Sequence, residues 1–302
     1  MEYQPAQTAS SGETPETTAT PVTRAVPSPK PWTTRGSVLL GMPQLDACGL
    51  SETWLQKTCG ERHWRGLADT LGVPAEAWRD ADGKRVYAAF GIVRLLSARL
   101  DSALEGQRLN ITSRLAPVGR SQAWSRHRAA VDGGTVGMLE MLSVFIGRGE
   151  DGSNRSVRRV PMRAPGQPAG PAPARALAEH ARAWRARVAS TPPALPGAPA
   201  GQRFLPCPRG DFNGAGLVYF ASFTAWADRA LFGWGLLGPA DRVVERECLY
   251  LGNLDLGHEV EVSLAGHVPA ADRRRCIEVT IRCPRHDRVL ARMRLLTGPV
   301  PA

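Results

Sequence analysis

Residues 211–232, DFNGAGLVYFASFTAWADRALF, join a polar, glycine-rich head to a long apolar run. Asn213, Gly214 and Gly216 in the head favour a turn, because Asn and Gly accept backbone conformations that other residues avoid. The apolar residues that follow recur largely at spacings of three and four, which predicts a buried helix over residues 218–234. Backbone N–H groups at such a corner also favour negative charge on a ligand. The head therefore predicts either a simple helix cap or a site that stabilises an oxyanion.

An earlier part of the chain resembles this head. Residues 44–50, QLDACGL, align with residues 211–217, DFNGAGL. The alignment pairs equivalent positions of two corners: Asp46 with Asn213, Gly49 with Gly216, and Leu50 with Leu217. A Trp-bearing helix is predicted after each corner, over residues 51–71 and 218–234. The repeat indicates two degenerate copies of one structural unit.

Alternating apolar residues predict four strands after each helix. The predicted strands of the first half lie near residues 84–96, 107–115, 121–131 and 135–146. Those of the second half lie near residues 242–254, 259–268, 276–283 and 289–296. Each half is thus predicted to be α+β, with one long helix followed by a four-stranded antiparallel meander and a possible short strand ahead of the helix.

The motif Asp-x-Asn-Gly-Ala-Gly-Leu-Val at residues 211–218 resembles the Asp-x-Asp-x-x-Gly-Ile-Val segment of hot-dog acyl-CoA thioesterases of the 4-hydroxybenzoyl-CoA type. The resemblance implies a hot-dog fold, in which a sheet wraps a long helix, and two copies imply a tandem hot-dog in one chain. In that family the second Asp is the catalytic carboxylate. Asn213 holds this position and cannot act as a general base, although it can donate a hydrogen bond to a thioester oxygen. Asp46 holds the equivalent position of the first half, where it can act as a general base or cap the helix.

Three segments of the first half carry a second resemblance: residues 40–55 (LGMPQLDACGLSETWL), 60–64 (GERHW) and 86–90 (VYAAF). They are similar to bacterial biosynthetic proteins related to the bifunctional acyltransferase/decarboxylase of the leinamycin polyketide pathway. This likeness implies transfer of a malonyl-type group from coenzyme A to an acyl carrier protein with loss of carbon dioxide. Coenzyme A and phosphopantetheine would be substrate groups, and no bound cofactor is expected. The likeness also implies that Tyr87 is catalytic.

Decarboxylation of such a thioester passes through an enolate, whose oxygen needs hydrogen-bond donors, each typically worth about 2.7–4 kcal/mol. The predicted catalytic residues are Tyr87, Asp46 and Asn213. The predicted substrate-binding residues are Gly49, Leu50, Asp211, Gly214, Gly216 and Tyr219. Two alternatives remain open. One is a thioesterase, centred on Asp46, or a dehydratase; the other is a non-catalytic acyl-binding module, which the amide at position 213 favours.

The chain of 302 residues is 43% apolar, which is enough for two cores of roughly 100 residues each. Residues 1–34 are predicted to be a disordered tail, because little in them can be buried. Residues 35–150 form the first predicted hot-dog domain and residues 202–302 the second. Between them, residues 151–201 form a Pro/Ala-rich linker, with a helix near residues 174–189 whose apolar stripe is expected to pack across both domains.

The net charge is +10, and arginine supplies almost all of the positive charge. Guanidinium groups suit phosphate recognition, so the partners expected are acyl-CoA and an acidic acyl carrier protein. Nucleic-acid motifs are absent, and no apolar run reaches the roughly 18 residues of a membrane span. The six cysteines show no C-x-x-C spacing, and no secretory signal precedes them, which indicates a cytoplasmic protein. Cys59 and His63 lie one helical turn apart, but no further ligands accompany them, so no metal site is predicted; a homodimer remains possible.

Overall fold

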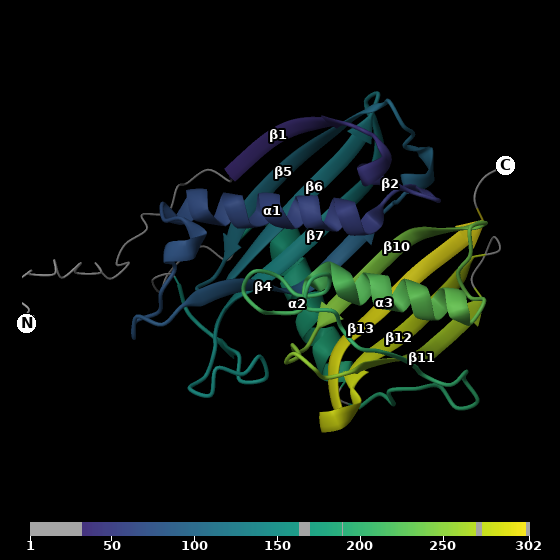
Figure 1. The fold of residues 1–302 in the computed structure, drawn as a ribbon. Coiled ribbons are helices and arrows are strands. Elements are labelled where there is room, and N and C mark those ends of the chain that lie inside the picture. Colours follow the sequence, from purple (N-terminus) through teal and green to yellow (C-terminus); the bar gives the residue numbers. More distant parts are fainter. Residues whose placement is uncertain (1–31, 163–169, 189, 270–273, 300–302) are drawn as a thin grey trace, which may run out of the picture.

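The computed structural model describes residues 32–162, 170–188, 190–269 and 274–299 (Figure 1). The disorder predicted for residues 1–31 lies outside this part of the chain. The prediction of disorder is wrong for residues 32–34, which form the start of strand β1 (Trp32–Leu39). The Trp32 ring packs on Gly66, and its Nε1 donates to Asp69 at 2.8 Å. These contacts fix the start of β1 against α1.

The first half contains one long helix and five strands of the main sheet. They are β1, α1 (Glu52–Leu71), β4 (Val86–Leu96), β5 (Arg108–Val118), β6 (Gln122–Val131) and β7 (Gly134–Gly147), with short strands β2 (Leu45–Asp46), β3 (Gly49–Leu50) and β8 (Arg158–Arg159). The strand order is β1-β5-β6-β7-β4. The predicted meander is therefore wrong in one respect. β4 does not pair with β5; it pairs with β7, so that its other edge is free for the second half.

The second half repeats this order. Its elements are β9 (Gln202–Phe204), α3 (Phe220–Gly233), β10 (Asp241–Tyr250), β11 (Val260–Pro269), β12 (Arg275–Cys283) and β13 (Arg288–Pro299). The strand order is β10-β13-β12-β11-β9, and antiparallel pairing of β4 with β10 joins both halves into one sheet of 11 strands in the described part of the chain. The fold is thus a tandem hot-dog, as predicted.

Helices α1 and α3 lie side by side on one face of the sheet (Figure 1). Their apolar faces share one core, which includes Leu55, Phe223 and Trp226. Gly60 permits close contact between the helices, since a Cβ atom there would lie 2.9 Å from the Phe220 ring. None of the described helices has the length and apolar character needed to cross a membrane.

Helix α2 (Ala172–Val188) covers the opposite face of the sheet (Figure 1). Its buried residues Leu177 and Trp184 share a core with Leu142 of the first half and Leu249 of the second. The predicted apolar stripe of this helix therefore packs across the central strand pair and connects the two halves.

A β-bulge interrupts β4 at Gly91. The pairing of β4 with β7 shifts between Phe90 and Ile92. As a result, Phe90 faces α1 and α3, whereas Ile92 faces α2. Bulges often redirect side chains next to functional sites, and the cavity described below lies against this one.

The two predicted corners have the same architecture but differ in length by one residue. Asp46 Oδ1 accepts a hydrogen bond from the Cys48 N–H, and Asn213 Oδ1 accepts one from the Ala215 N–H. Leu45 pairs with Leu50, whereas Phe212 pairs with Val218. Leu50 is therefore equivalent to Val218 and not to Leu217, because the second turn contains one extra residue.

Two histidines are buried between α1 and the sheet of the first half. His63 contacts the hydroxyls of Ser125 at 2.7 Å and Ser143 at 2.8 Å, and His127 contacts those of Ser125 and Ser113, each at 2.8 Å. Burial lowers the pKa of His63 to about 3 and lowers the pKa of His127 well below its usual value. Both imidazoles are therefore neutral in the folded protein.

Acid is expected to destabilise the fold through His63. Its pKa is lower in the folded than in the unfolded chain, so between about pH 6.5 and about pH 3 the unfolded chain binds more protons. Stability then falls with pH by up to about 1.4 kcal/mol per pH unit for this histidine. Urea unfolding at pH 7 and pH 4.5 measures the effect. His63→Gln keeps hydrogen-bonding groups but cannot titrate, and an unchanged pH dependence in this variant would contradict the assignment.

Candidate functional site

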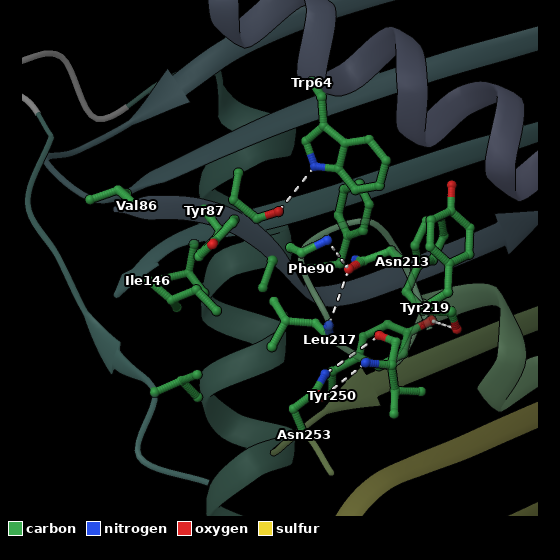
Figure 2. A pocket seen from close by; sticks show the side chains of 18 of the residues that line it. Trp64, Val86, Tyr87, Phe90, Ile146, Asn213, Leu217, Tyr219, Tyr250 and Asn253 are labelled. Atoms are coloured by element: carbon green, nitrogen blue, oxygen red, sulfur yellow. Dashed lines mark hydrogen bonds between the residues drawn. The ribbon is translucent and has the colours of Figure 1, made fainter. Parts of the chain in front are cut away.

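A cavity of about 710 Å³, here called the first cleft, lies where α1 and β4 face the loop that leads into α3 (Figure 2). Apolar side chains form much of its wall: Trp64, Phe90, Ile146, Leu217, Val218 and Phe220. The rings of Phe90 and Phe220 lie 4.5 Å apart and join the two halves at this wall. A cleft of this size and lining suits an acyl chain.

Tyr87 projects from β4 at this cleft (Figure 2). Two guanidinium groups lie near its ring, Arg85 at 5.4 Å and Arg148 at 5.3 Å from the ring centre. Arg148 Nη1 also donates a hydrogen bond to the tyrosine hydroxyl at 3.4 Å. The hydroxyl therefore sits beside a cation that can stabilise negative charge on a neighbouring oxygen.

Arg148 connects Tyr87 to the glycine-rich head. It donates to Asn154 Oδ1 at 3.1 and 2.9 Å and to the Ala215 carbonyl. Asn154 Nδ2 donates in turn to the Gly216 carbonyl at 2.6 Å and the Leu254 carbonyl at 2.8 Å. In the described part of the chain, Arg148 forms no ion pair with a carboxylate. No carboxylate among these residues therefore neutralises its charge, which acts on the Tyr87 hydroxyl.

Asn213 is fixed by the turn that it caps. Its Oδ1 accepts hydrogen bonds from the N–H groups of Ala215 at 3.0 Å and Leu217 at 3.2 Å. Within the described residues its Nδ2 has no partner, so this amide is the group that can donate to a ligand. Tyr219, the residue before α3, gives the helix no side-chain cap. Because Tyr219 and Phe220 line the cleft, the positive end of the α3 dipole lies at the cleft near Asn213.

The first cleft brings together four of the predicted site residues: Tyr87, Asn213, Gly214 and Tyr219. Asp211 does not line it. Its carboxylate accepts a hydrogen bond from the Cys207 N–H at 2.8 Å, and its carbonyl accepts one from the Tyr219 N–H at 2.7 Å, so Asp211 supports the loop. Gly216 is also outside the lining, and its positive φ of 68° allows the tight turn.

Asp46 and Leu50 lie at a second cleft, a cavity of about 350 Å³ near the start of α1. Gly49 packs against the Leu100 carbonyl beside it, where a Cβ atom would not fit. The predicted site residues are therefore divided between two clefts. Each corner belongs to its own cleft, because the two halves are related by the antiparallel pairing of β4 with β10 and point in opposite directions.

Buried charges lie at the base of the second cleft. Arg246 is 2% exposed and forms ion pairs with Glu52 at 3.0 Å and Asp228 at 2.8 Å. Burial raises the pKa of Glu52 and of Asp228, although Arg246 opposes this shift. Together with Asp46, these groups carry more negative than positive charge, which disfavours an anionic ligand in the second cleft.

The first cleft carries positive charge, in contrast to the second cleft. Its lining includes Arg85, Arg159 and Arg185, and its carboxylate is the exposed Glu61. The pKa of Arg185 is lowered by burial and by repulsion from Arg159. Such a wall attracts phosphates and carboxylates. The positive cleft is therefore the better candidate site for an acyl thioester.

Sequence reasoning missed Arg148, Asn154 and Asn253. Asn253 Oδ1 accepts a hydrogen bond from the Val218 N–H at 2.9 Å and so holds the end of the same loop. All three lie in irregular segments that follow strands, where no periodic signal exists. A turn-rich polar run after a predicted strand, such as residues 148–154, was the one available indication.

Solved structures of thioesterases share this fold. A putative oleoyl thioesterase from Lactobacillus plantarum matches with a TM-score of 0.65 and 13% identity over 90% of this chain and 97% of that chain. A 12:0-ACP thioesterase from Umbellularia californica matches with a TM-score of 0.59 and 10% identity, over 88% and 94%. An acyl-ACP thioesterase from Bacteroides thetaiotaomicron matches with a TM-score of 0.54 and 10% identity over 88% of this chain and 98% of that chain. No protein-family model and no curated protein sequence matches the chain.

Proposed function

We propose that this protein is an enzyme that binds an acyl thioester of coenzyme A or of an acyl carrier protein in the first cleft and cleaves its thioester bond. The observation that carries the proposal is the meeting of three features in this cleft: an apolar wall, the Tyr87 hydroxyl beside Arg148, and the start of α3 beside Asn213. The apolar wall suits the acyl chain, and the polar groups suit the thioester.

The acyl chain would pack on the apolar wall, and the thioester oxygen would face Asn213 Nδ2 and the start of α3. Attack on the carbonyl carbon places negative charge on this oxygen, and donors aimed at that charge lower the barrier. In hydrolysis, a water oxygen bonds to the carbonyl carbon, the C–S bond breaks, and the thiol leaves with a proton. Hydrolysis is the first candidate, because the proteins that share the fold are described as thioesterases.

Decarboxylating acyl transfer is the second candidate. Two observations favour it. The arginines of the wall suit a malonyl-type substrate, which carries its own carboxylate, and no carboxylate of the described residues bonds to Tyr87 or Arg148. In this route the Tyr87 oxygen bonds to the acyl carbon, the C–S bond breaks, and coenzyme A leaves as the thiol with the tyrosine proton. A phosphopantetheine thiol then takes the acyl group, and its proton returns to the Tyr87 oxygen. Loss of carbon dioxide leaves an enolate, which takes up one proton. The same donors near Asn213 would stabilise the enolate oxygen.

Mass spectrometry separates the two reactions. The protein is incubated with dodecanoyl-CoA, malonyl-CoA or methylmalonyl-CoA, with and without a phosphopantetheinylated carrier protein. Free acid and free coenzyme A without the carrier would establish hydrolysis. A carrier that gains the acyl group minus carbon dioxide would establish decarboxylating transfer. If no thioester loses its thiol under either condition, the proposed enzymatic function is wrong and an acyl-binding role takes its place.

A further inference from the structure

Three potential metal ligands converge at the turn between β12 and β13. Cys283 is the last residue of β12, and His286 lies three residues later in a short 3₁₀ turn, η4 (Pro284–His286). His258, just before β11, lies beside them, and the two imidazole rings are 5.1 Å apart. One ligand atom from each residue lies within 4.8 Å of the others. This cluster is separate from both clefts.

The individual ligands are suited to a metal. Cys283 is buried, and the buried Nδ1 of His258 has no hydrogen-bond partner among the described residues. A buried nitrogen without a partner carries a desolvation cost, which a bound ion would remove. The exposed His286 gives the site an opening to solvent, so an ion can enter.

We propose that His258, Cys283 and His286 bind Zn²⁺. Two imidazoles and a thiolate are a ligand set that zinc prefers, and water or one further protein group would complete a tetrahedral site. The ligand atoms lie within 4.8 Å of one another, and the exposed side chain of His286 has room to move toward the other two. The thiol proton of Cys283 is released when the ion binds.

Two arginines surround the cluster and bear on its charge. Arg285 donates to His258 Nε2 at 3.2 Å, and Arg155 donates to His286 Nε2 at 3.4 Å. An imidazole can accept these hydrogen bonds only in its neutral form, which is also the form that binds metal. Both guanidinium groups lie on side chains with solvent access and would turn away when the ion binds.

The site is linked to the loop of the first cleft. Arg155 Nε donates to Asp255 Oδ2 at 2.9 Å, and Asp255 Oδ1 accepts a hydrogen bond from the Asn154 N–H at 2.7 Å. Asn154 in turn holds the Gly216 carbonyl. A metal ion would join the residue before β11 to the turn after β12 near this segment, so its expected role is structural.

Titration of the metal-free full chain with Co²⁺, a spectroscopic substitute for Zn²⁺, tests the proposal. Wild-type protein is expected to show thiolate-to-cobalt charge transfer that saturates at one equivalent and is abolished by Zn²⁺. Cys283→Ser should lose this band, whereas the matched variant Cys276→Ser, from the other end of β12, should keep it. His286→Ala, a change at an exposed residue, should weaken Co²⁺ binding at least tenfold without altering the circular dichroism spectrum.

Thermal unfolding gives a second readout. Zn²⁺ should raise the melting temperature of wild-type protein and of Cys276→Ser but not of Cys283→Ser or His286→Ala. Absence of the charge-transfer band in wild-type protein, or a band that persists in Cys283→Ser, would overturn the proposal. The result is independent of thioester cleavage, since neither readout depends on enzymatic activity.

Discussion

Replacing Tyr87 with Phe is expected to lower the kcat for thioester cleavage by about 10²–10⁴-fold, the usual contribution of a side chain that transfers a proton in the transition state. At the first cleft, Arg148 Nη1 donates a hydrogen bond to the Tyr87 hydroxyl at 3.4 Å. The ring of the phenylalanine would keep its contacts with Arg85 and Arg148, so KM should change little. Release of free coenzyme A, followed with a thiol reagent, measures both constants.

Asp46→Asn provides the comparison, because Asp46 lies at the second cleft. The amide can still accept the hydrogen bond from the Cys48 N–H, so the local turn should be preserved. We expect its kcat to remain within a few-fold of the wild-type value. A large loss in Asp46→Asn together with full activity in Tyr87→Phe would place the reaction in the second cleft and reject the assignment made here.

Replacing Arg246 with Met is expected to lower the free energy of unfolding by about 3–5 kcal/mol, since removing one member of a buried ion cluster leaves unpaired charges behind. Arg246 is 2% exposed and pairs with both Glu52 and Asp228. Without it, the two carboxyl groups would face each other in a partly apolar cavity. Urea-induced unfolding at pH 7, followed by tryptophan fluorescence, measures the change.

Arg65→Met is the matched control, because Arg65 pairs with Glu61 on the surface of α1, where both side chains are more than 60% exposed. Exposed pairs of this kind contribute about 0–1 kcal/mol. The triple change Arg246→Met, Glu52→Gln and Asp228→Asn removes all three charges and should recover part of the loss. Equal effects of Arg246→Met and Arg65→Met would contradict the account of the buried cluster.

The helices and strands were predictable because their signals are local. The apolar spacing within residues 51–71 and 218–234 identified α1 and α3, which begin and end within two residues of these limits. Period-two alternation identified all eight long strands that follow the helices. The repeat of the two corners was also detectable, since Asp46 and Asn213 cap equivalent turns. The single extra residue in the second turn could not be detected from the sequence, because it shows only in the strand pairing on either side of the turn.

The sequence by itself determined the α+β elements, their repetition and the positive charge, because periodicity and composition do not depend on distant contacts. The tertiary structure decided which residues meet. Pairing of β4 with β10 places the two corners at different clefts, one lined by arginines and the other by carboxylates. Arg148 reaches Ala215 across 67 positions of the chain, and Asn154 reaches Gly216 across 62. Such contacts depend on strand order, which no local pattern encodes.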